Sequence, residues 1–112
     1  FIGDKVIQRI AKVIKSTISA QDIAVRFGGE EFIVVMVNKT MSQAHEVAEK
    51  IRLAISQLKL MQRDSKAYLP KISVSIGVTQ RQEELNWAAI FAQADTALYQ
   101  AKNSGRNRSV CL

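Results

Sequence analysis

The sequence predicts an α+β domain with a mainly antiparallel central sheet and helices on both faces of that sheet. Three observations lead to this fold class. Apolar residues recur at helical spacing in three stretches, two short apolar segments flank a Gly-Gly pair, and one further segment alternates apolar and small residues. Helix and strand signals in mixed order, with a hairpin among them, are typical of α+β domains. The length of 112 residues allows one domain with a single core.

The first half of the chain is predicted to form a helix followed by a β-hairpin. The helix spans residues 4–19, and Asp4 is a plausible N-cap because its carboxylate can accept the free N–H groups of the first turn. Residues 22–27 alternate as in a strand, the Gly-Gly pair supplies the positive φ angles of a tight turn, and residues 32–37 return as a nearly all-apolar strand. Burial of such a strand on both faces requires helices on both sides of the sheet.

The middle of the chain is predicted to form a second helix and a third strand. Residues 42–59 carry one apolar stripe at helical spacing, and the polar stretch 61–70 is expected to be irregular. Residues 71–78 alternate as the clearest strand of the sequence. Its small residues share one face, where they leave room for a helix or a ligand: Ser73, Ser75 and Gly77.

The C-terminal part is predicted to form a third helix and a final edge strand. The helix spans residues 87–103, with Asn86 as its N-cap and Gly105 as the residue just past its C-cap. Residues 108–112 form the strand. The predicted order is therefore α-β-β-α-β-α-β.

The composition indicates a domain without a membrane-spanning segment and favours contact with anions. The formal net charge is +6, the single cysteine fits a reducing compartment, and no apolar run approaches the roughly 20 residues of a membrane span. We expect a cytoplasmic domain with no direct membrane contact, and leave open whether a larger protein is tethered. Basic residues line one face of the first helix, which is the usual solvated side, so no nucleic-acid partner is expected: Lys5, Arg9, Lys12 and Lys15.

The segment "RFGGEEF" places two carboxylates at the predicted turn. Neighbouring residues of a regular strand point to opposite faces, but a turn lets Glu30 project from the bend while Glu31 begins the strand. Carboxylate oxygens suit Mg²⁺, which typically takes one or two of them together with substrate phosphates and waters. The alternative is a hairpin whose tip is simply polar, and the segment alone favours that alternative.

The segment "AKNSGRNR" gathers three cations after the third helix: Lys102, Arg106 and Arg108. They could hold phosphates through charge-assisted hydrogen bonds. Equally, cations at a helix C-terminus are stabilised by the helix dipole without any ligand. This segment alone does not decide between the two interpretations.

Taken together, "RFGGEEF", "ISVSIGV" and "ADTALYQAKNSGRN" resemble the GGDEF family of diguanylate cyclases, with glutamate at the third signature position. The resemblance covers nearly the whole chain. It implies a palm-like, nucleotidyl-cyclase-type fold that carries the signature on a β-hairpin turn. It also implies condensation of two GTP into cyclic di-GMP with release of pyrophosphate, with Mg²⁺ or Mn²⁺ and one GTP on each protomer of a homodimer.

The resemblance also implies roles for individual residues. Glu30 and Glu31 would act as catalytic metal ligands, and Asp4 would read guanine, which gives Asp4 two rival roles. The positions matched to nucleotide binding are Asp4, Gly28, Gly29, Lys102 and Arg106. A catalytically inactive module that senses GTP or cyclic di-GMP is the alternative function. An RNA-binding domain is disfavoured because the predicted strands lack an aromatic platform.

Two departures from the family pattern limit the expected activity. The family's metal-binding aspartate and a guanine-reading asparagine would precede Phe1, so residues 1–112 form a single domain that lacks its N-terminal strand and first helix. We expect no turnover from this piece alone. The family's inhibitory Arg-x-x-Asp is degenerate, because Ser19 stands at the arginine position before Asp22. Weak or absent product inhibition through that site is expected.

Overall fold

The computed structural model describes residues 3–61, 68 and 70–112, and it confirms the α+β class and the order of elements. The predicted irregular stretch 61–70 lies mostly outside the described residues. The elements are α1 (Asp4–Thr17), β1 (Ile23–Gly28), β2 (Glu31–Val35), α2 (Met41–Ser56), β3 (Ile76–Val78), α3 (Trp87–Asn103) and β4 (Ser109–Cys111).

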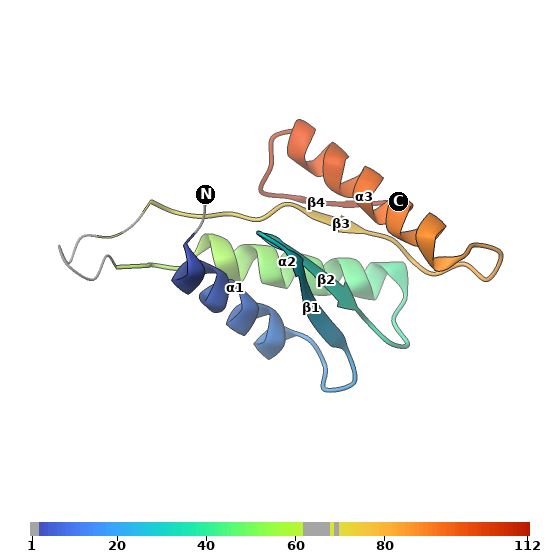
Figure 1. Cartoon of the computed structure of the whole chain (residues 1–112), viewed down its shortest axis with the longest axis horizontal. Coiled ribbons are helices and arrows are strands. Elements are labelled where there is room, and N and C mark those ends of the chain that lie inside the picture. The colour runs from blue at the N-terminus through green and yellow to red at the C-terminus, as the bar shows by residue number, and fades with distance from the viewer. Residues whose placement is uncertain (1–2, 62–67, 69) are drawn as a thin grey trace.

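The described strands form two separate pairs. β1 and β2 are the predicted antiparallel hairpin, in register from Ile23 opposite Val35 to Gly28 opposite Glu31. β3 and β4 pair in parallel, which the sequence pattern did not indicate. Parallel strands need a crossover connection, and α3 provides it (Figure 1). A mainly antiparallel arrangement therefore holds for the hairpin and not for the second pair.

β3 lies between two helices, as predicted for the sheet. Val78 packs with Ala44 and Ala48 of α2, while α3 covers the opposite face. On that face a Cβ added to Gly77 would lie 2.5 Å from the backbone nitrogen of Leu98. The small face predicted to admit a helix or a ligand thus admits a helix.

Among the described residues, the core covers one face of the hairpin. Phe32 and Val34 of β2 pack against the largest buried cluster, which α1 and α2 form: Ile10, Ile14, Ile51 and Ile55. On β1, Ile23, Val25 and Phe27 are 57%, 51% and 70% exposed. The prediction of burial on both faces concerned the return strand, and residues 32–35 of β2 are all partly buried, while β3 lies between two helices.

The helix ends follow from local hydrogen bonds. The Thr40 hydroxyl accepts from Gln43 N–H, and the Gln43 side chain accepts from Thr40 N–H, which makes a capping box at the start of α2. Asn86 caps α3 as predicted, because its side-chain oxygen accepts from Ala89 N–H at 2.8 Å. α2 ends at Ser56, slightly earlier than the predicted limit.

Candidate functional site

The tip of the hairpin carries the two glutamates of the signature. Gly28 pairs with Glu31, so Gly29 and Glu30 form the centre of the turn and Glu31 begins β2, as predicted. Of the two glycines of the turn, Gly29 has a positive φ, of 36°, and Gly28 does not, so the prediction of positive φ at both glycines is wrong for Gly28. A bulge between Arg26 and Gly28 displaces the turn by one residue.

Arg26 stabilises this turn, a role that the sequence pattern did not indicate. Its Nε and Nη2 donate to the Gly29 carbonyl oxygen at 2.9 and 2.6 Å. The signal in the sequence is an arginine three residues before the turn centre, where its planar fork can return to one acceptor. These two bonds fix the Gly29 carbonyl at the centre of the turn.

The outer side of the turn is open to a ligand. Glu30 and Glu31 are exposed, and a Cβ added to Gly28 or Gly29 would meet nothing within 4 Å. Among the described residues no cluster of three or more His, Cys, Asp or Glu could hold a metal ion. The hairpin thus offers two carboxylates, the number that Mg²⁺ usually takes from protein when phosphates and waters complete its shell.

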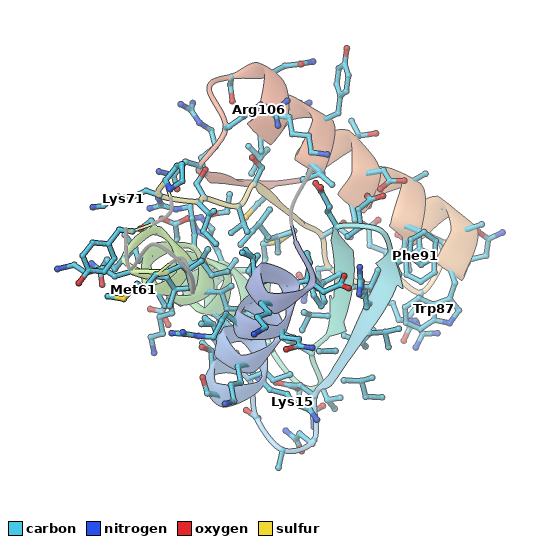
Figure 2. All side chains as sticks on the ribbon, turned by 60° about the vertical axis from the view of Figure 1, so that its left-hand side comes forward. Lys15, Met61, Lys71, Trp87, Phe91 and Arg106 are labelled. Atoms are coloured by element: carbon cyan, nitrogen blue, oxygen red, sulfur yellow. The ribbon has the colours of Figure 1, made fainter. Side chains whose placement is uncertain are left out.

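The turn that follows α3 carries the predicted phosphate contacts. Lys102 lies in the last helical turn, and Arg106 follows Gly105, which sits just past the C-cap Ser104 as predicted. Arg106 N–H donates to the Ala101 carbonyl at 2.9 Å, the long-range bond of a Schellman motif. The Lys102 and Arg106 side chains are exposed, and neither makes a hydrogen bond or ion pair within the described part of the chain. Figure 2 shows Arg106 at the surface.

In Figure 1 the tip of the hairpin and the turn after α3 both lie near the middle of the long axis, with the N-terminal end of α1 to their left. Asp4 is the first residue of α1, and the N-cap is Gly3, with no side-chain capping bond. The predicted N-cap role of Asp4 is therefore wrong, since the helix begins one residue earlier than that role requires. Its exposed carboxylate keeps the other role open.

Asp22 is buried and its carboxylate is fully used inside the fold. It accepts from Val37 N–H at 2.9 Å, from Ser19 N–H at 3.0 Å and from Lys39 Nζ at 3.0 Å. Burial raises the pKa of Asp22, but the bonds from Val37, Lys39 and Ser19 outweigh it and the net pKa is lowered. Asp22 therefore joins the α1–β1 loop to the chain after β2.

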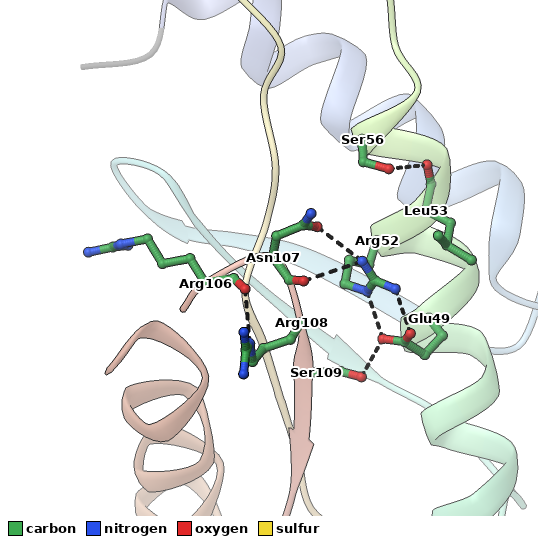
Figure 3. A network of polar contacts seen from close by, with 8 residues as sticks. All are labelled: Glu49, Arg52, Leu53, Ser56, Arg106, Asn107, Arg108 and Ser109. Atoms are coloured by element: carbon green, nitrogen blue, oxygen red, sulfur yellow. Dashed lines mark hydrogen bonds and ion pairs between the residues drawn. The ribbon is translucent and has the colours of Figure 1, made fainter. Parts of the chain in front are cut away.

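A second polar cluster, drawn in Figure 3, ties α2 to the segment after α3. Arg52 donates to both oxygens of Glu49 at 2.8 Å, and Ser109 Oγ donates to Glu49 at 2.6 Å. These bonds from Arg52 and Ser109 lower the pKa of Glu49 to about 2. Arg52 also donates to the Asn107 carbonyl and Oδ1 at 3.3 and 3.1 Å. The sequence showed only the Glu-x-x-Arg spacing on a helix.

The fold and these positions define a class of protein: an α+β domain that presents carboxylates on a hairpin tip and cations beyond a helix, as binding of metal-complexed phosphates requires. A family model described as "Diguanylate cyclase, GGDEF domain" matches residues 2–108. The chain belongs to this family. No helix in the described residues is long and apolar enough to cross a membrane.

The similar proteins include two that are named as diguanylate cyclases. The chain is 42% identical over 107 residues to diguanylate cyclase A of Treponema denticola, covering 95% of this chain and 28% of the relative. It is 37% identical over 110 residues to diguanylate cyclase VdcA of Vibrio cholerae, covering 98% of this chain and 32% of the relative. The chain therefore spans less than a third of the length of either relative.

Solved structures share the fold closely. The GGDEF domain of DgcB from Caulobacter crescentus, in complex with c-di-GMP, superposes with a TM-score of 0.93 at 33% identity, covering 96% of this chain and 63% of that one. The active GGEEF domain of a diguanylate cyclase from Vibrio cholerae gives a TM-score of 0.80 at 34% identity, covering 96% and 67%. The second structure is named for the GGEEF variant that this chain also carries.

Proposed function

We propose that this chain forms most of a catalytic domain that condenses two GTP molecules into cyclic di-GMP and releases pyrophosphate. One GTP would bind to each protomer of a homodimer, and the 3′-hydroxyl of one nucleotide would attack the α-phosphate of the other. The observation that carries the proposal is the pair of exposed carboxylates on an open turn, in a chain that also presents two exposed cations at and just after the end of α3. The cytoplasm, where GTP is made, is the expected location.

The position of each site residue supports a particular role in the proposed reaction. Glu30 and Glu31 would hold Mg²⁺ or Mn²⁺, which when bound neutralises charge that develops on the phosphates. Gly28 and Gly29 leave space for the nucleotide to lie against the backbone. Lys102 and Arg106 would hold the leaving pyrophosphate by charge-assisted hydrogen bonds.

Asp4 is proposed to recognise the guanine base. A carboxylate can accept both the ring N–H and the amino N–H of a guanine edge. Asp4 is the exposed first residue of α1, and its side chain makes no hydrogen bond that caps the helix. Its carboxylate is therefore available for such a contact.

We propose that a preceding strand and helix of a longer protein complete the domain. The described strands form two pairs that share no backbone pairing, and a strand between them would join both. The exposed apolar side chains of β1 would gain cover from a helix. The same strand would supply the third carboxylate that the described residues lack. This piece by itself is accordingly expected to show no turnover.

The test uses the intact protein that contains this chain. With GTP and Mg²⁺ or Mn²⁺ it should form cyclic di-GMP and pyrophosphate, measured by chromatography, and removal of the metal should stop the reaction. Glu30→Gln should abolish synthesis because it removes a charged ligand at unchanged size. Glu84→Gln, at an exposed position away from the hairpin, is the matched control. Undiminished synthesis by Glu30→Gln would refute the metal assignment, and GTP binding without synthesis would favour the sensing module.

A further inference from the structure

The turn after α3 has a backbone that needs outside support. Gly105, Arg106 and Asn107 follow one another with φ of 128°, 59° and 45°. Glycine adopts such angles freely, whereas arginine and asparagine adopt them at a cost that surrounding contacts must offset. The conformation of this turn decides where the Arg106 side chain points.

Helix α2 supplies that support. Arg52 Nη1 reaches across the molecule to the backbone carbonyl and side-chain oxygen of Asn107, the residue that follows Arg106. The other side of the Arg52 guanidinium is fixed by two bonds to Glu49, and Glu49 in turn accepts from Ser109. α2 therefore holds the turn at two points, one on each side of residue 108.

The Arg52 side chain is only 17% exposed, so its guanidinium is held between α2 and the turn. Figure 3 shows the Arg106 side chain pointing away from this network. The Arg106 guanidinium therefore takes no part in this network and stays available to a ligand. The network does, however, fix the backbone next to Arg106 through Asn107.

We propose that Arg52, oriented by Glu49, is a positioning residue for Arg106: it fixes the turn in the one conformation that presents the Arg106 guanidinium to nucleotide phosphates. The proposal rests on the proposed function of Arg106 and extends it to a pair of residues on a different helix. A lysine at position 52 could not replace the arginine, since an ammonium group lacks the planar fork that bonds Glu49 and Asn107 together.

The test is a double-mutant cycle on the intact protein with 3′-deoxy-GTP, which lacks the attacking hydroxyl. Its dissociation constant is measured by calorimetry with Mg²⁺ for Arg52→Gln, Arg106→Gln and the double variant. Each single change should weaken binding roughly tenfold, the loss typical of a hydrogen bond to a charged group. The double variant should bind no worse than Arg106→Gln alone, because Arg52 acts only through Arg106.

A merely structural role gives a different result. If Arg52 only stabilised the fold, the two losses would multiply to about a hundredfold, and that outcome overturns the proposal. An unchanged affinity in Arg52→Gln overturns it as well. Lys50→Gln removes a charge from an exposed position of the same helix and should leave binding unchanged. Should Arg52→Gln fail to fold, Arg52→Lys takes its place in the cycle with the same expected pattern.

The proposed activity and the positioning role of Arg52 can be refuted separately. Wild-type protein that binds 3′-deoxy-GTP but makes no cyclic di-GMP from GTP would refute the proposed activity, while the binding cycle would still decide the role of Arg52. Wild-type protein that binds no 3′-deoxy-GTP would overturn both. Normal synthesis together with normal binding in Arg52→Gln would overturn the positioning role alone.

Discussion

Replacing Asp22 with alanine should destabilise the domain far more than an ordinary surface substitution. The change leaves the N–H groups of Ser19 and Val37 without their acceptor and leaves Lys39, 17% exposed, without its ion pair. A buried donor without a partner costs about 1–3 kcal/mol, and breaking a buried ion pair from one side costs about 3–5 kcal/mol. Since these costs overlap at one carboxylate, we expect a loss of about 3–5 kcal/mol in the free energy of unfolding.

Urea unfolding followed by circular dichroism measures this loss, with Asp95→Ala on the exposed face of α3 as the matched control. A loss below about 1 kcal/mol, within the range of surface ion pairs, would refute the structural role of Asp22. The same carboxylate is unavailable to a bound product, which supports the expectation of weak product inhibition. Tight binding of cyclic di-GMP that depends on Asp22 in a folded variant would contradict that expectation.

Two further predictions concern packing and pH. Gly77→Ala should lower the free energy of unfolding by more than about 3 kcal/mol, because the added Cβ would meet the backbone of α3 at Ala94 and Leu98. Backbone atoms cannot move aside as a flexible side chain would. Thermal unfolding measures the loss, and an unchanged midpoint temperature would contradict it. The pKa of Glu49 is about 2 in the fold against 4.5 ordinarily, so its contribution to stability is complete above pH 4.5 and is lost as the pH falls toward 2. Urea unfolding between pH 6 and pH 2 should show a shallower acid loss in Glu49→Gln, and identical slopes would show that Glu49 is not the group involved.

The elements that the sequence predicted well are those fixed by local physics. The periodic apolar stripe of α1, the hairpin turn and the Asn86 cap depend on residues a few positions apart. The stripe and the cap were found in place, and the turn lies one residue later than the Gly-Gly pair. The predicted strand over residues 71–78 shows the limit of such reasoning. Its alternation is real, but only Ile76–Val78 pairs with a neighbour among the described residues, because a strand also needs a partner.

In the candidate site, too, the features that depend on neighbouring residues were predicted, and the contacts between distant residues were not. Glu30 and Glu31 could be placed at the tip because a turn is a local feature, whereas the partners of Asp22 and Arg52 are distant in sequence. Arg52 and Asn107 are 55 residues apart, and no spacing rule links a helical arginine to an asparagine that far along the chain. The prediction of Asp4 as the N-cap failed by a single residue, because the N-cap preference does not distinguish the cap from the first helical position.

These contacts separate the residues that hold the site from those that would act in it. Asp22 fastens the base of the hairpin through Val37, just past the end of β2, and Arg52 fastens the turn that carries Arg106. Both anchors are charged groups shielded by the fold, and both are held by several bonds. Lys102 and Arg106 are exposed and unpaired within the described residues. Under the proposed function, Asp22 would hold the hairpin that bears Glu30 and Glu31, Arg52 would hold the turn that bears Arg106, and the exposed side chains themselves would contact the nucleotide.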